Sequence, residues 1–535
     1  MYLRVTNLRL PLDREEKEAF RRACRQAGLK EEEVRGWRLA RKAVDARRSK
    51  VEFVYTIDLE VEEEQLHRVL SRSPAGVSLY QEEEYRPGPP LPPQPLRPVV
   101  VGAGPAGLFA ALYLAERGLK PLVLERGRDV ETRAEDVRRF WETGQLDPES
   151  NVQFGEGGAG TFSDGKLTTR LNDSRLRYIL RVFVDHGAPP EILYYYRPHI
   201  GTDRLRQVVL NLRRHLQSLG VEVRFGAKVT DLLLEKGRVV GVVVNDQEEI
   251  ETRAVILAIG HSARDTYAML ARKGLTLMAK PFAVGLRIEH LQEVIDRAQY
   301  GAYAGHPRLG AADYQLVYHD EETGRAAYTF CMCPGGQVIA AASEEGGVVT
   351  NGMSDYARAS GVANSAVVVT VGPEDFPGDG VLAGVEFQRR LERKAFTAGG
   401  GGFRAPAQET GDFLRDGGGR TPVPAFATYR PGVTSTDLYR CLPPVVGEVL
   451  PRALRYFGRK IKGFTGTPSV LTGVETRTSA PVRIVRGEDG QAPGAEGLYP
   501  AGEGAGYAGG IMSAALDGLR AAEALVRNLE KGERG

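Results

Sequence analysis

The stretch from Val99 to Gly127 constrains the fold of this chain more than any other part of the sequence. It opens with the β-branched run Val99–Val101 and ends just after a second apolar run, Leu122–Leu124. Both runs have the composition of short strands that are buried on both faces of a parallel sheet. Between them lie a glycine-rich turn and an alanine-rich segment of helical character. The sequence therefore predicts a strand–turn–helix–strand unit of the kind found in doubly wound α/β folds.

The spacing of the glycines in this unit predicts a dinucleotide site. Gly102 permits the sharp turn, Gly104 lets a pyrophosphate approach the backbone, and Gly107 lets the helix pack closely on the strand. The helix N-terminus then offers free N–H groups and a positive dipole to the phosphates. Glu125, at the end of the second strand, can accept hydrogen bonds from the ribose hydroxyls. The residues expected to contact the dinucleotide are Gly102, Gly104, Pro105, Ala106, Gly107, Glu125 and Arg126.

A second motif, near the other end of the chain, separates FAD from NAD. The segment from Gly497 to Gly518 contains Ala-Gly-Glu at 501–503 and two adjacent glycines before a helical run. It resembles the C-terminal FAD motif of the glutathione-reductase-like flavoproteins, with Glu503 in place of the usual Asp. The resemblance implies a helix whose positive N-terminus faces the flavin and stabilises its anionic reduced form. The residues expected to contact FAD here are Gly502, Glu503, Gly509, Gly510 and Ile511.

The loop from Asn151 to Leu167 carries more glycine than a globular core needs, which is typical of backbone that lies flat against a ligand. We expect it to follow the pyrophosphate toward the isoalloxazine, with Lys166 near flavin N5 or a substrate anion. A strand at Val221–Val229 is expected to give backbone contacts to adenine. The apolar run Ala254–Gly260 resembles the Ala-Thr-Gly strand of the same flavoproteins, with Ile259 in place of Thr. The further cofactor contacts expected from these segments are Gly158, Ala159, Gly160, Gly165, Val229 and Gly260.

The chain divides into three units and a linker. Residues 1–86 have the βαββαβ pattern of a small ferredoxin-like α/β domain. Residues 87–98 contain seven prolines, which predicts a semi-rigid polyproline II linker. The FAD-binding domain is discontinuous, because its two motifs lie near opposite ends of the chain, and is expected at residues 97–266 and 481–530. Residues 267–480 form an inserted mixed α+β substrate domain.

Six residues are candidates for catalysis or substrate contact. Arg264, just after the Ala254–Gly260 strand, is a candidate for binding a phosphate or a carboxylate. Cys331 and Cys333 share one face of a predicted strand, where they either face the flavin or serve as small buried apolar residues. Alternation also places Glu475, Arg477 and Ser479 on one face, so that they can converge on one ligand. The candidates are Lys166, Arg264, Cys331, Cys333, Glu475 and Arg477.

Composition limits the class of protein. The 535 residues carry a net charge of only +2, so bulk charge favours no particular partner. Four cysteines suggest neither a disulfide framework nor a metal site. The N-terminus lacks the pattern of a signal peptide, and no apolar run is long enough for a transmembrane helix. We therefore expect a cytoplasmic protein that does not bind membranes.

One local cluster of charge leaves a second function open. The segment from Arg35 to Lys50 carries seven basic residues against one acid, Asp45. This segment is either an RNA- or partner-binding face, tested by neutralising Arg41, Lys42, Arg47 and Arg48, or a solvated strand face.

Several strings taken together resemble a family of bacterial FAD-dependent dehydrogenases, NAD(P)/FAD-dependent oxidoreductases within the glutathione-reductase-like superfamily. They are residues 151–167, 331–336, 351–354, 473–484 and 499–511. The family implies an FAD-dependent oxidoreductase that transfers a hydride or electrons through flavin N5 to or from a small substrate. NAD(P)H is left open as a transient reductant, since the sequence holds no second strand–GxGxxG–helix unit for it. An RNA-binding or RNA-modifying flavoprotein and a flavin-stabilised scaffold without turnover are the alternatives.

Overall fold

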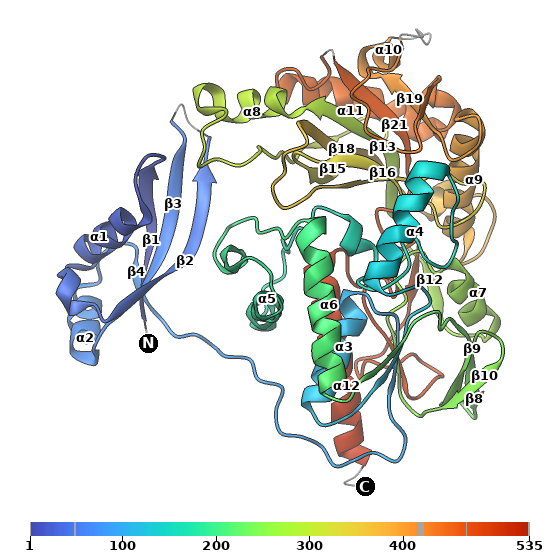
Figure 1. Cartoon of the computed structure of the whole chain (residues 1–535), viewed down its shortest axis with the longest axis horizontal. Helices are drawn as coiled ribbons and strands as arrows, with labels where there is room; N and C mark the ends of the chain where they lie inside the picture. The colour runs from blue at the N-terminus through green and yellow to red at the C-terminus, as the bar shows by residue number, and fades with distance from the viewer. Residues whose placement is uncertain (1, 48–49, 416–421, 467, 533–535) are drawn as a thin grey trace.

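The computed structural model describes residues 2–47, 50–415, 422–466 and 468–532. Figure 1 shows a small unit at one side of the molecule, joined to a larger body by a long extended segment. The small unit is an antiparallel sheet of order β2-β3-β1-β4 covered by two helices, in the strand–helix–strand–strand–helix–strand order expected from the sequence. Its elements are β1 (Tyr2–Pro11), α1 (Glu16–Ala27), β2 (Gly36–Asp45), β3 (Glu52–Glu60), α2 (Glu63–Arg72) and β4 (Val77–Tyr80).

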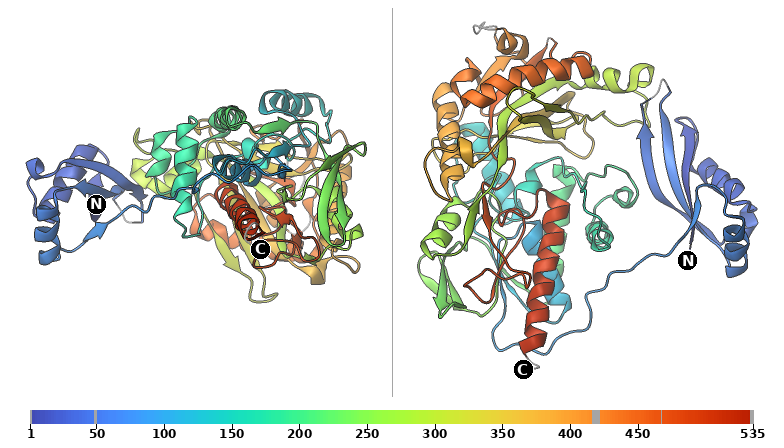
Figure 2. Two further views of the ribbon diagram at one scale, coloured as in Figure 1. Left: turned by 90° about the horizontal axis from the view of Figure 1, so that it is seen from below. Right: turned by 180° about the vertical axis from the view of Figure 1, so that it is seen from behind.

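Figure 2 shows the segment after β4 running from the small unit toward the C-terminus of the chain, and hydrogen bonds attach it to the body. The Arg117 side chain donates a 2.6 Å hydrogen bond to the carbonyl of Pro89, and the N–H of Leu91 donates to the Arg117 carbonyl at 2.7 Å. Tyr85 donates to the carboxylate of Glu523 at 2.6 Å. These contacts fix the linker against the body, which limits how freely it can act as a spacer.

A five-stranded parallel sheet forms the centre of the body. Its order is β23-β11-β5-β6-β7, as in a doubly wound nucleotide-binding fold, and the two sequence motifs both contribute strands. The predicted strand Val221–Val229 is split, because only three of its residues pair with β6 and the next strand begins at Val229. The strands are β5 (Val99–Val101), β6 (Leu122–Leu124), β7 (Glu222–Arg224), β11 (Val255–Leu257) and β23 (Leu498–Pro500).

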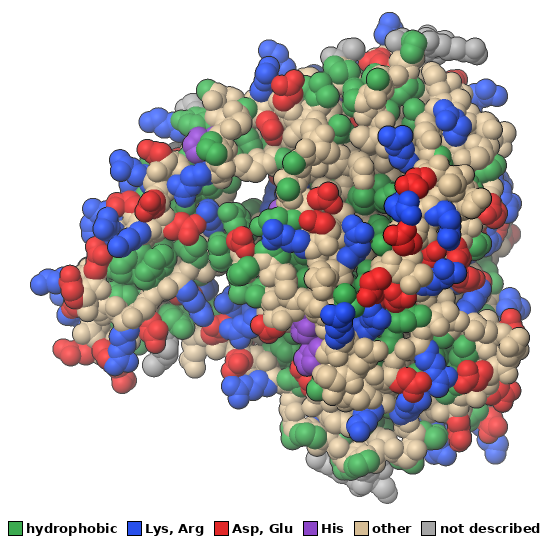
Figure 3. Space-filling view, viewed as in Figure 1, with side chains coloured by type: hydrophobic (Ala, Val, Ile, Leu, Met, Phe, Trp, Pro, Cys, Tyr) green, Lys and Arg blue, Asp and Glu red, His purple; other side chains and the backbone are tan. Residues whose placement is uncertain are grey.

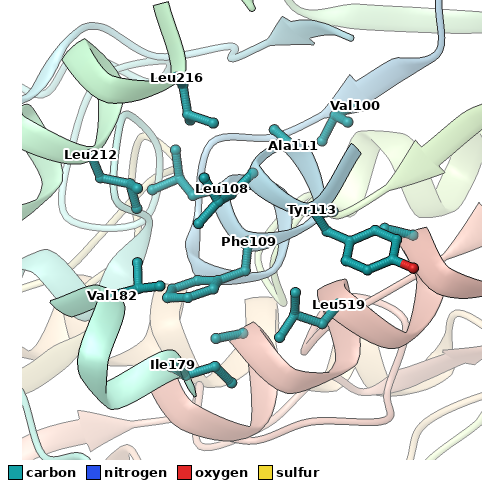
Figure 4. Packing of buried hydrophobic residues seen from close by; sticks show 14 of the residues in the cluster. Val100, Leu108, Phe109, Ala111, Tyr113, Ile179, Val182, Leu212, Leu216 and Leu519 are labelled. Carbon is teal, nitrogen blue, oxygen red and sulfur yellow. The ribbon is translucent and has the colours of Figure 1, made fainter. Parts of the chain in front are cut away.

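Helices cover one face of this sheet, and a three-stranded antiparallel meander and a helix cover the other. Figure 4 shows Val100 of the sheet beside Ala111 and the ring of Phe109 beside Val182, in one cluster with Leu212 and Leu519 from two further helices. The helical layer consists of α3 (Pro105–Glu116), α5 (Arg175–Asp185), α6 (Thr202–Ser218) and α12 (Ile511–Gly532). The opposite layer consists of β8 (Val229–Glu235), β9 (Arg238–Val244), β10 (Glu248–Glu251) and α7 (Arg264–Arg272). The charged helix α4 (Val130–Thr143) follows β6.

Most of the segment between the two halves of the parallel-sheet region folds around a seven-stranded mixed sheet of order β14-β15-β18-β13-β21-β19-β20, at the top of Figure 1. Its strands are β13 (Phe282–Leu291), β14 (Val317–His319), β15 (Ala326–Cys333), β18 (Val362–Val371), β19 (Ala405–Glu409), β20 (Val433–Ser435) and β21 (Ser469–Glu475). Its helices are α8 (Gln292–Tyr300), α9 (Ala383–Ala398), α10 (Thr410–Leu414) and α11 (Pro444–Lys460). Two smaller sheets pair β16 (Gln337–Ala340) with β17 (Thr350–Met353), and β12 (Leu277–Ala279) with β22 (Val482–Ile484).

The small unit is docked on the body through the edge strand β2. The N–H of Lys42 donates to the Tyr194 carbonyl at 2.8 Å, and the N–H of Tyr196 donates to the Lys42 carbonyl at 2.9 Å. A second contact comes from Arg308 of the body, which donates to the carbonyl of Leu12 in the small unit at 2.7 Å. The sheet of the small unit is thus extended by one bridge of backbone from the body.

The basic segment of β2 is neutralised by its own neighbours. Arg38 contacts Asp58 and Glu82, and the buried Lys42 contacts Glu16 at 2.7 Å. Arg47 pairs with Asp45, while Arg41 lies over the ring of Tyr196 at 4.2 Å. This pairing does not favour a free nucleic-acid face. Arg48 lies outside the described residues.

Among the described residues, no helix combines the length and apolar character needed to cross a bilayer.

The crossing of α3 and α12 yields a test of the fold. At Gly518, an added Cβ would lie 2.0 Å from the carbonyl oxygen of Ala106. Alanine is favoured over glycine in a helix interior by about 1 kcal/mol, so helix propensity alone would stabilise an alanine variant. A net loss of stability would therefore come from overpacking against Ala106, which typically costs about 1–3 kcal/mol. We expect Gly518→Ala to lower the thermal unfolding midpoint. The control is Gly447→Ala in α11, where the nearest atom belongs to the exposed ring of Tyr439 at 3.3 Å. Equal midpoints for both variants would contradict close packing at this crossing.

Candidate functional site

A cavity of about 910 Å³ lies between the parallel sheet and the mixed sheet, and it collects most of the predicted site residues. We call one side of it the motif wall, because it is lined by the two glycine motifs and the segments next to them. The motif wall consists of Val101–Ala106, Leu124–Arg126, Gln153–Gly160, Ala227–Val229, Ala258–Ala263, Ala501–Glu503 and Gly509–Ala514, of which most residues line the cavity. The second wall consists of lining residues in the ranges 163–180, 196–198, 313–315, 329–333, 351–358 and 475–478.

Glu125 joins three segments of the motif wall. One carboxylate oxygen accepts the N–H of Ala103 at 2.8 Å, and the other accepts those of Gly127 at 2.9 Å and Gly155 at 3.0 Å. The side chain is buried but lines the cavity. It therefore fixes the turn after β5, the turn after β6 and the glycine-rich loop at once, while facing the space where a ribose is expected.

The glycine-rich loop is held by a side chain that the sequence did not single out. Arg133, on α4, is fully buried and donates to five carbonyls of this loop at 2.7–3.2 Å. Burial lowers the pKa of this guanidinium to about 10, so it remains charged at neutral pH. Nothing in the local sequence distinguishes Arg133 from the other arginines of its charged helix.

The glycines of the motif wall leave room for a ligand. A Cβ on Gly260, Gly509 or Gly510 would meet no other atom within 4 Å, so each of these backbones faces open space. Gly104 and Gly158 approach each other closely, since a Cβ on Gly158 would lie 3.1 Å from the Gly104 Cα. Helix α3 begins at Pro105 and α12 at Ile511, and the first residue of each lines the cavity. Two long helices thus direct their N-termini at the same space, which suits an anionic pyrophosphate and an anionic reduced flavin.

Two predicted contacts do not line the cavity. Gly107 is packed under the turn, where a Cβ would lie 1.8 Å from the Gly102 carbonyl oxygen. Gly165 has a φ of +65° and lies against the backbone of Gly201. The predicted contacts that do line the cavity are Gly102, Gly104, Pro105, Ala106, Glu125, Arg126, Gly158, Ala159, Gly160, Val229, Gly260, Gly502, Glu503, Gly509, Gly510 and Ile511.

Two charged side chains of the motif wall, Arg126 and Glu503, have different surroundings. Arg126 forms a two-bond pair with Asp265 at 2.9 Å and lies over the ring of Phe154 at 4.0 Å. Burial raises the pKa of Glu503 to about 7, which the nearby Lys280 only partly offsets. Glu503 is therefore poised to be either donor or acceptor toward a ligand hydroxyl near neutral pH.

Arg264 occupies a different place from the one predicted. It does not line the cavity, and its guanidinium binds Glu392 through two bonds of 3.0 and 2.8 Å and Glu344 at 2.8 Å. A buried arginine whose donors are taken by carboxylates has little left for a substrate. Its position just after the Ala254–Gly260 strand could not reveal this pairing, because Glu344 and Glu392 are distant in sequence.

Arg477 shares the same buried carboxylate but reaches the cavity. It donates to both oxygens of Glu392 at 3.1 Å, and to the hydroxyls of Ser262 and Ser343 at 3.1 and 2.6 Å. Burial alone would raise the pKa of Glu392, but the two guanidinium groups outweigh it and hold that pKa well below its usual range.

The expected convergence of Glu475, Arg477 and Ser479 is not present. Glu475 forms a two-bond pair with the fully buried Arg287, both contacts at 3.0 Å, and Ser479 accepts from Lys280 at 2.7 Å. Each residue of the alternating set therefore has a separate partner. Glu475 and Arg477 still both line the cavity.

Cys331 and Cys333 line the cavity but do not share a face. The pairing of β15 with β18 shifts between Phe330 and Cys333, and Cys331 has a φ of +43°. This bulge leaves Cys331 accessible and Cys333 buried. Surrounding protein raises the pKa of Cys331 to about 12 and also raises that of Cys333, so both are protonated thiols at neutral pH. Neither has the thiolate character that a thiol redox relay needs.

Lys166 projects from the glycine-rich loop into the second wall. Its ammonium donates to the carbonyl of Met332, next to the two cysteines. The neighbouring Asp164 is taken by Arg358 at 2.9 Å and by the hydroxyl of Ser354 at 2.8 Å. Among the described residues, Lys166 has no carboxylate within ion-pair distance.

Comparison with known proteins bears on this arrangement. The family described as "FAD-dependent protein, C-terminal domain-like" matches residues 281–478, and "FAD dependent oxidoreductase" matches residues 195–365. "NAD(P)-binding Rossmann-like domain" matches residues 100–158, the stretch of the first motif, and a domain of unknown function matches residues 2–60. An uncharacterized protein of Clostridium beijerinckii is 46% identical over 533 residues, which is 99% of each chain.

The chain belongs to the FAD-dependent oxidoreductases. Its cofactor is FAD, and the motif wall contains residues suited to hold it: the two helix N-termini, the open glycines and Glu125. This flavoprotein is also 29% identical to protein FixC of Escherichia coli over 244 residues, covering 42% of this chain and 52% of FixC. The crystal structure of CtdE in complex with FAD aligns with a TM-score of 0.32 and 13% identity, over 82% of this chain and 89% of that one.

Glu125 provides a test of the motif wall. We expect Glu125→Ala to lower FAD retention, because the change removes charge-assisted hydrogen bonds worth about 1.5–3 kcal/mol each and frees three backbone segments. The ratio of flavin to protein absorbance after gel filtration, and the dissociation constant for added FAD, measure the effect. The control is Glu249→Ala on the exposed face of β10. Normal FAD retention in the Glu125 variant would contradict its assigned role.

Arg264 and Arg477 are expected to differ in their effects. Arg264→Met leaves Glu392 and Glu344 short of a partner away from the cavity, so we expect a loss of stability of about 3–5 kcal/mol with normal flavin spectra in the protein that remains folded. Arg477→Met should cost stability and also perturb the flavin absorbance band, because Arg477 lines the cavity. Chemical denaturation and visible spectra report the two effects. A perturbed spectrum in Arg264→Met alone would reverse the assignment.

Proposed function

We propose that this flavoprotein is a dehydrogenase acting on a small substrate that binds at the second wall of the cavity. The observation that carries the proposal is the continuity of one cavity across both motif regions and the mixed sheet. A substrate at the second wall and a cofactor at the motif wall would share this cavity, which favours direct transfer between them. Bound FAD supplies transfer of a hydride or of electrons through N5.

The residues of the chain have supporting roles in this proposal. Glu125 and the glycine-rich loop hold the dinucleotide, and the N-terminus of α12 offers positive potential to the reduced cofactor. Arg477 presents a fixed positive charge to the cavity, because Glu392 and two serines orient its guanidinium. Cys331 and Cys333 act as neutral lining groups, and Lys166 is the candidate for direct contact with substrate.

The division of the chain that underlies the proposal follows the sequence. We take residues 1–86 as a ferredoxin-like domain, residues 97–266 and 481–530 as the FAD-binding domain, and residues 267–480 as the substrate domain. The antiparallel order β2-β3-β1-β4 supports the first assignment. The pairing of Arg38, Lys42 and Arg47 with carboxylates does not favour the RNA-binding alternative.

We further propose that the reductant reacts directly at the flavin. A nicotinamide cofactor with its own site would need a second parallel sheet with a glycine turn. In the parts of the chain that the structure describes, the parallel sheet built on β5 is the one such sheet, and its glycine turn belongs to the FAD motif. In this arrangement NAD(P)H binds only transiently when it serves as the reductant.

Anaerobic reduction of the purified holoprotein tests the proposal. We expect the flavin band to bleach rapidly with at least one small metabolite from a broad panel, and slowly with NADH or NADPH. The extracted flavin should be FAD rather than FMN. A flavin that no metabolite or nicotinamide reduces would favour the scaffold without turnover. A nicotinamide cofactor bound with its pyrophosphate on a second helix N-terminus would overturn direct reaction at the flavin.

A further inference from the structure

The cations of the second wall are not all balanced. Five basic side chains line it, and three have carboxylate partners: Arg358 with Asp164 at 2.9 Å, Arg197 with Asp313 at 2.6 Å, and Arg477 with Glu392 at 3.1 Å. The lining carboxylate of Glu475 is in turn taken by Arg287.

Two cations remain without such a partner. Among the described residues, no carboxylate lies within ion-pair distance of Lys166 or Arg170, which are on the same short loop. Lys166 is half-buried, and its one hydrogen bond given by the structure goes to a backbone carbonyl. A partly desolvated ammonium that faces a cavity without a counter-charge is most simply satisfied by a ligand anion.

The same loop and the next helix supply an apolar surface beside these cations. Leu167 and Leu171 line the cavity, and Leu171 is 45% exposed, which is high for a leucine. On α5, Leu176 and Leu180 are one turn apart and also line the cavity, whereas Ile179, Val182 and Phe183 are buried in the core. Leu176 and Leu180 are only partly buried against that core, so helix α5 presents a second apolar stripe to the cavity.

An aromatic residue completes this surface at the rim. Tyr196 lines the cavity and is 54% exposed. It belongs to the loop whose backbone bonds to β2 of the small unit. Figure 3 shows an opening between the small unit and the body. Exposed apolar residues gathered around a cavity, next to cations, are typical of a ligand site and not of scattered surface residues.

We propose that the second wall binds an anionic substrate with an apolar chain, its acidic group at Lys166 and Arg170 and its chain along Leu171, Leu176 and Leu180. This inference rests on the proposed function, because it names the class of substrate for that site. A small polar acid would satisfy the two cations but leave the leucines exposed. A neutral hydrocarbon would cover the leucines but leave the ammonium of Lys166 without a counter-charge. The amphipathic acid is the class that satisfies both.

Isothermal calorimetry of the FAD-loaded protein tests the inference with straight-chain alkanoates. We expect affinity to rise from butanoate to octanoate by roughly threefold to fourfold per methylene, as burial of each methylene predicts. Octanoate should bind roughly tenfold or more tightly than 1-octanol, because a hydrogen bond to a charged group is involved. Octyl phosphate distinguishes a phosphate head from a carboxylate head, and either preference is compatible with the site.

Variants separate the two halves of the site. Lys166→Met should lower the preference for octanoate over octanol, with Arg170 retaining part of it, while leaving octanol binding and FAD content unchanged. Leu180→Asn should flatten the dependence on chain length while keeping the preference for the anion. The controls are Lys462→Met and Arg214→Met, which remove exposed cations that do not line the cavity.

Each of the following results would overturn the inference. They are equal binding of octanoate and octanol, affinity that does not change with chain length, and NADPH binding that depends on Lys166 while alkanoates do not bind at all. The last would assign the cations to a nucleotide phosphate. Rapid flavin reduction by a polar metabolite together with absent alkanoate binding would refute this inference and leave the proposed function standing. A flavin that cannot be reduced would refute the proposed function itself.

Discussion

Two buried charges of opposite sign hold the backbone on which the cofactor depends. Glycine loses more conformational entropy on folding than any other residue, so a loop rich in it is ordered only where fixed partners compensate. Arg133 supplies donors to five carbonyls of the glycine-rich loop, and Glu125 supplies acceptors to three N–H groups around it. Side chains thus bind both carbonyl and N–H groups in and around the loop. This matters because most of the loop lies in neither a strand nor a regular helix. The shape of the motif wall follows from these eight contacts.

A second buried node relates the motif wall to the mixed sheet. Glu392, on α9, binds Arg264 at the start of α7 and Arg477 just after β21. Removal of one partner of such a group leaves a charge in a low-dielectric interior, which is costly. The Glu392–Arg264–Arg477 cluster therefore fixes the relative position of the two sheets on either side of the cavity. A motif search would assign these arginines to substrate binding, but their contacts here are structural.

The sequence predicted the parts of the site that depend on local pattern. The strand at Val99–Val101 and the βαββαβ order within residues 1–86 were predicted from periodicity and turn residues. The helix opening at Gly509–Ile511 was predicted from a resemblance to a known motif, and the structure has all three elements. The charge partners could not be predicted, because Arg133, Glu392 and Arg287 meet their partners through tertiary contacts only. Cys331 failed for another reason: a bulge in β15 shifts the alternation by which it was placed on a face. Alternation predicts a face only where the register is unbroken.

The edge of the small sheet has a consequence for the cavity. An unpaired edge strand is open to further backbone partners, and β2 uses that capacity within the chain by bonding to residues 194–196. Tyr196 and the adjoining Arg197 are also part of the second wall. Undocking the first 80 residues would therefore disturb two cavity-lining side chains. A ligand that contacts those two side chains binds more tightly when the small unit is docked. By thermodynamic reciprocity, the bound ligand then stabilises the docking of the small unit by the same free energy. Ligand binding in the cavity and docking of the small unit on the body are therefore thermodynamically coupled.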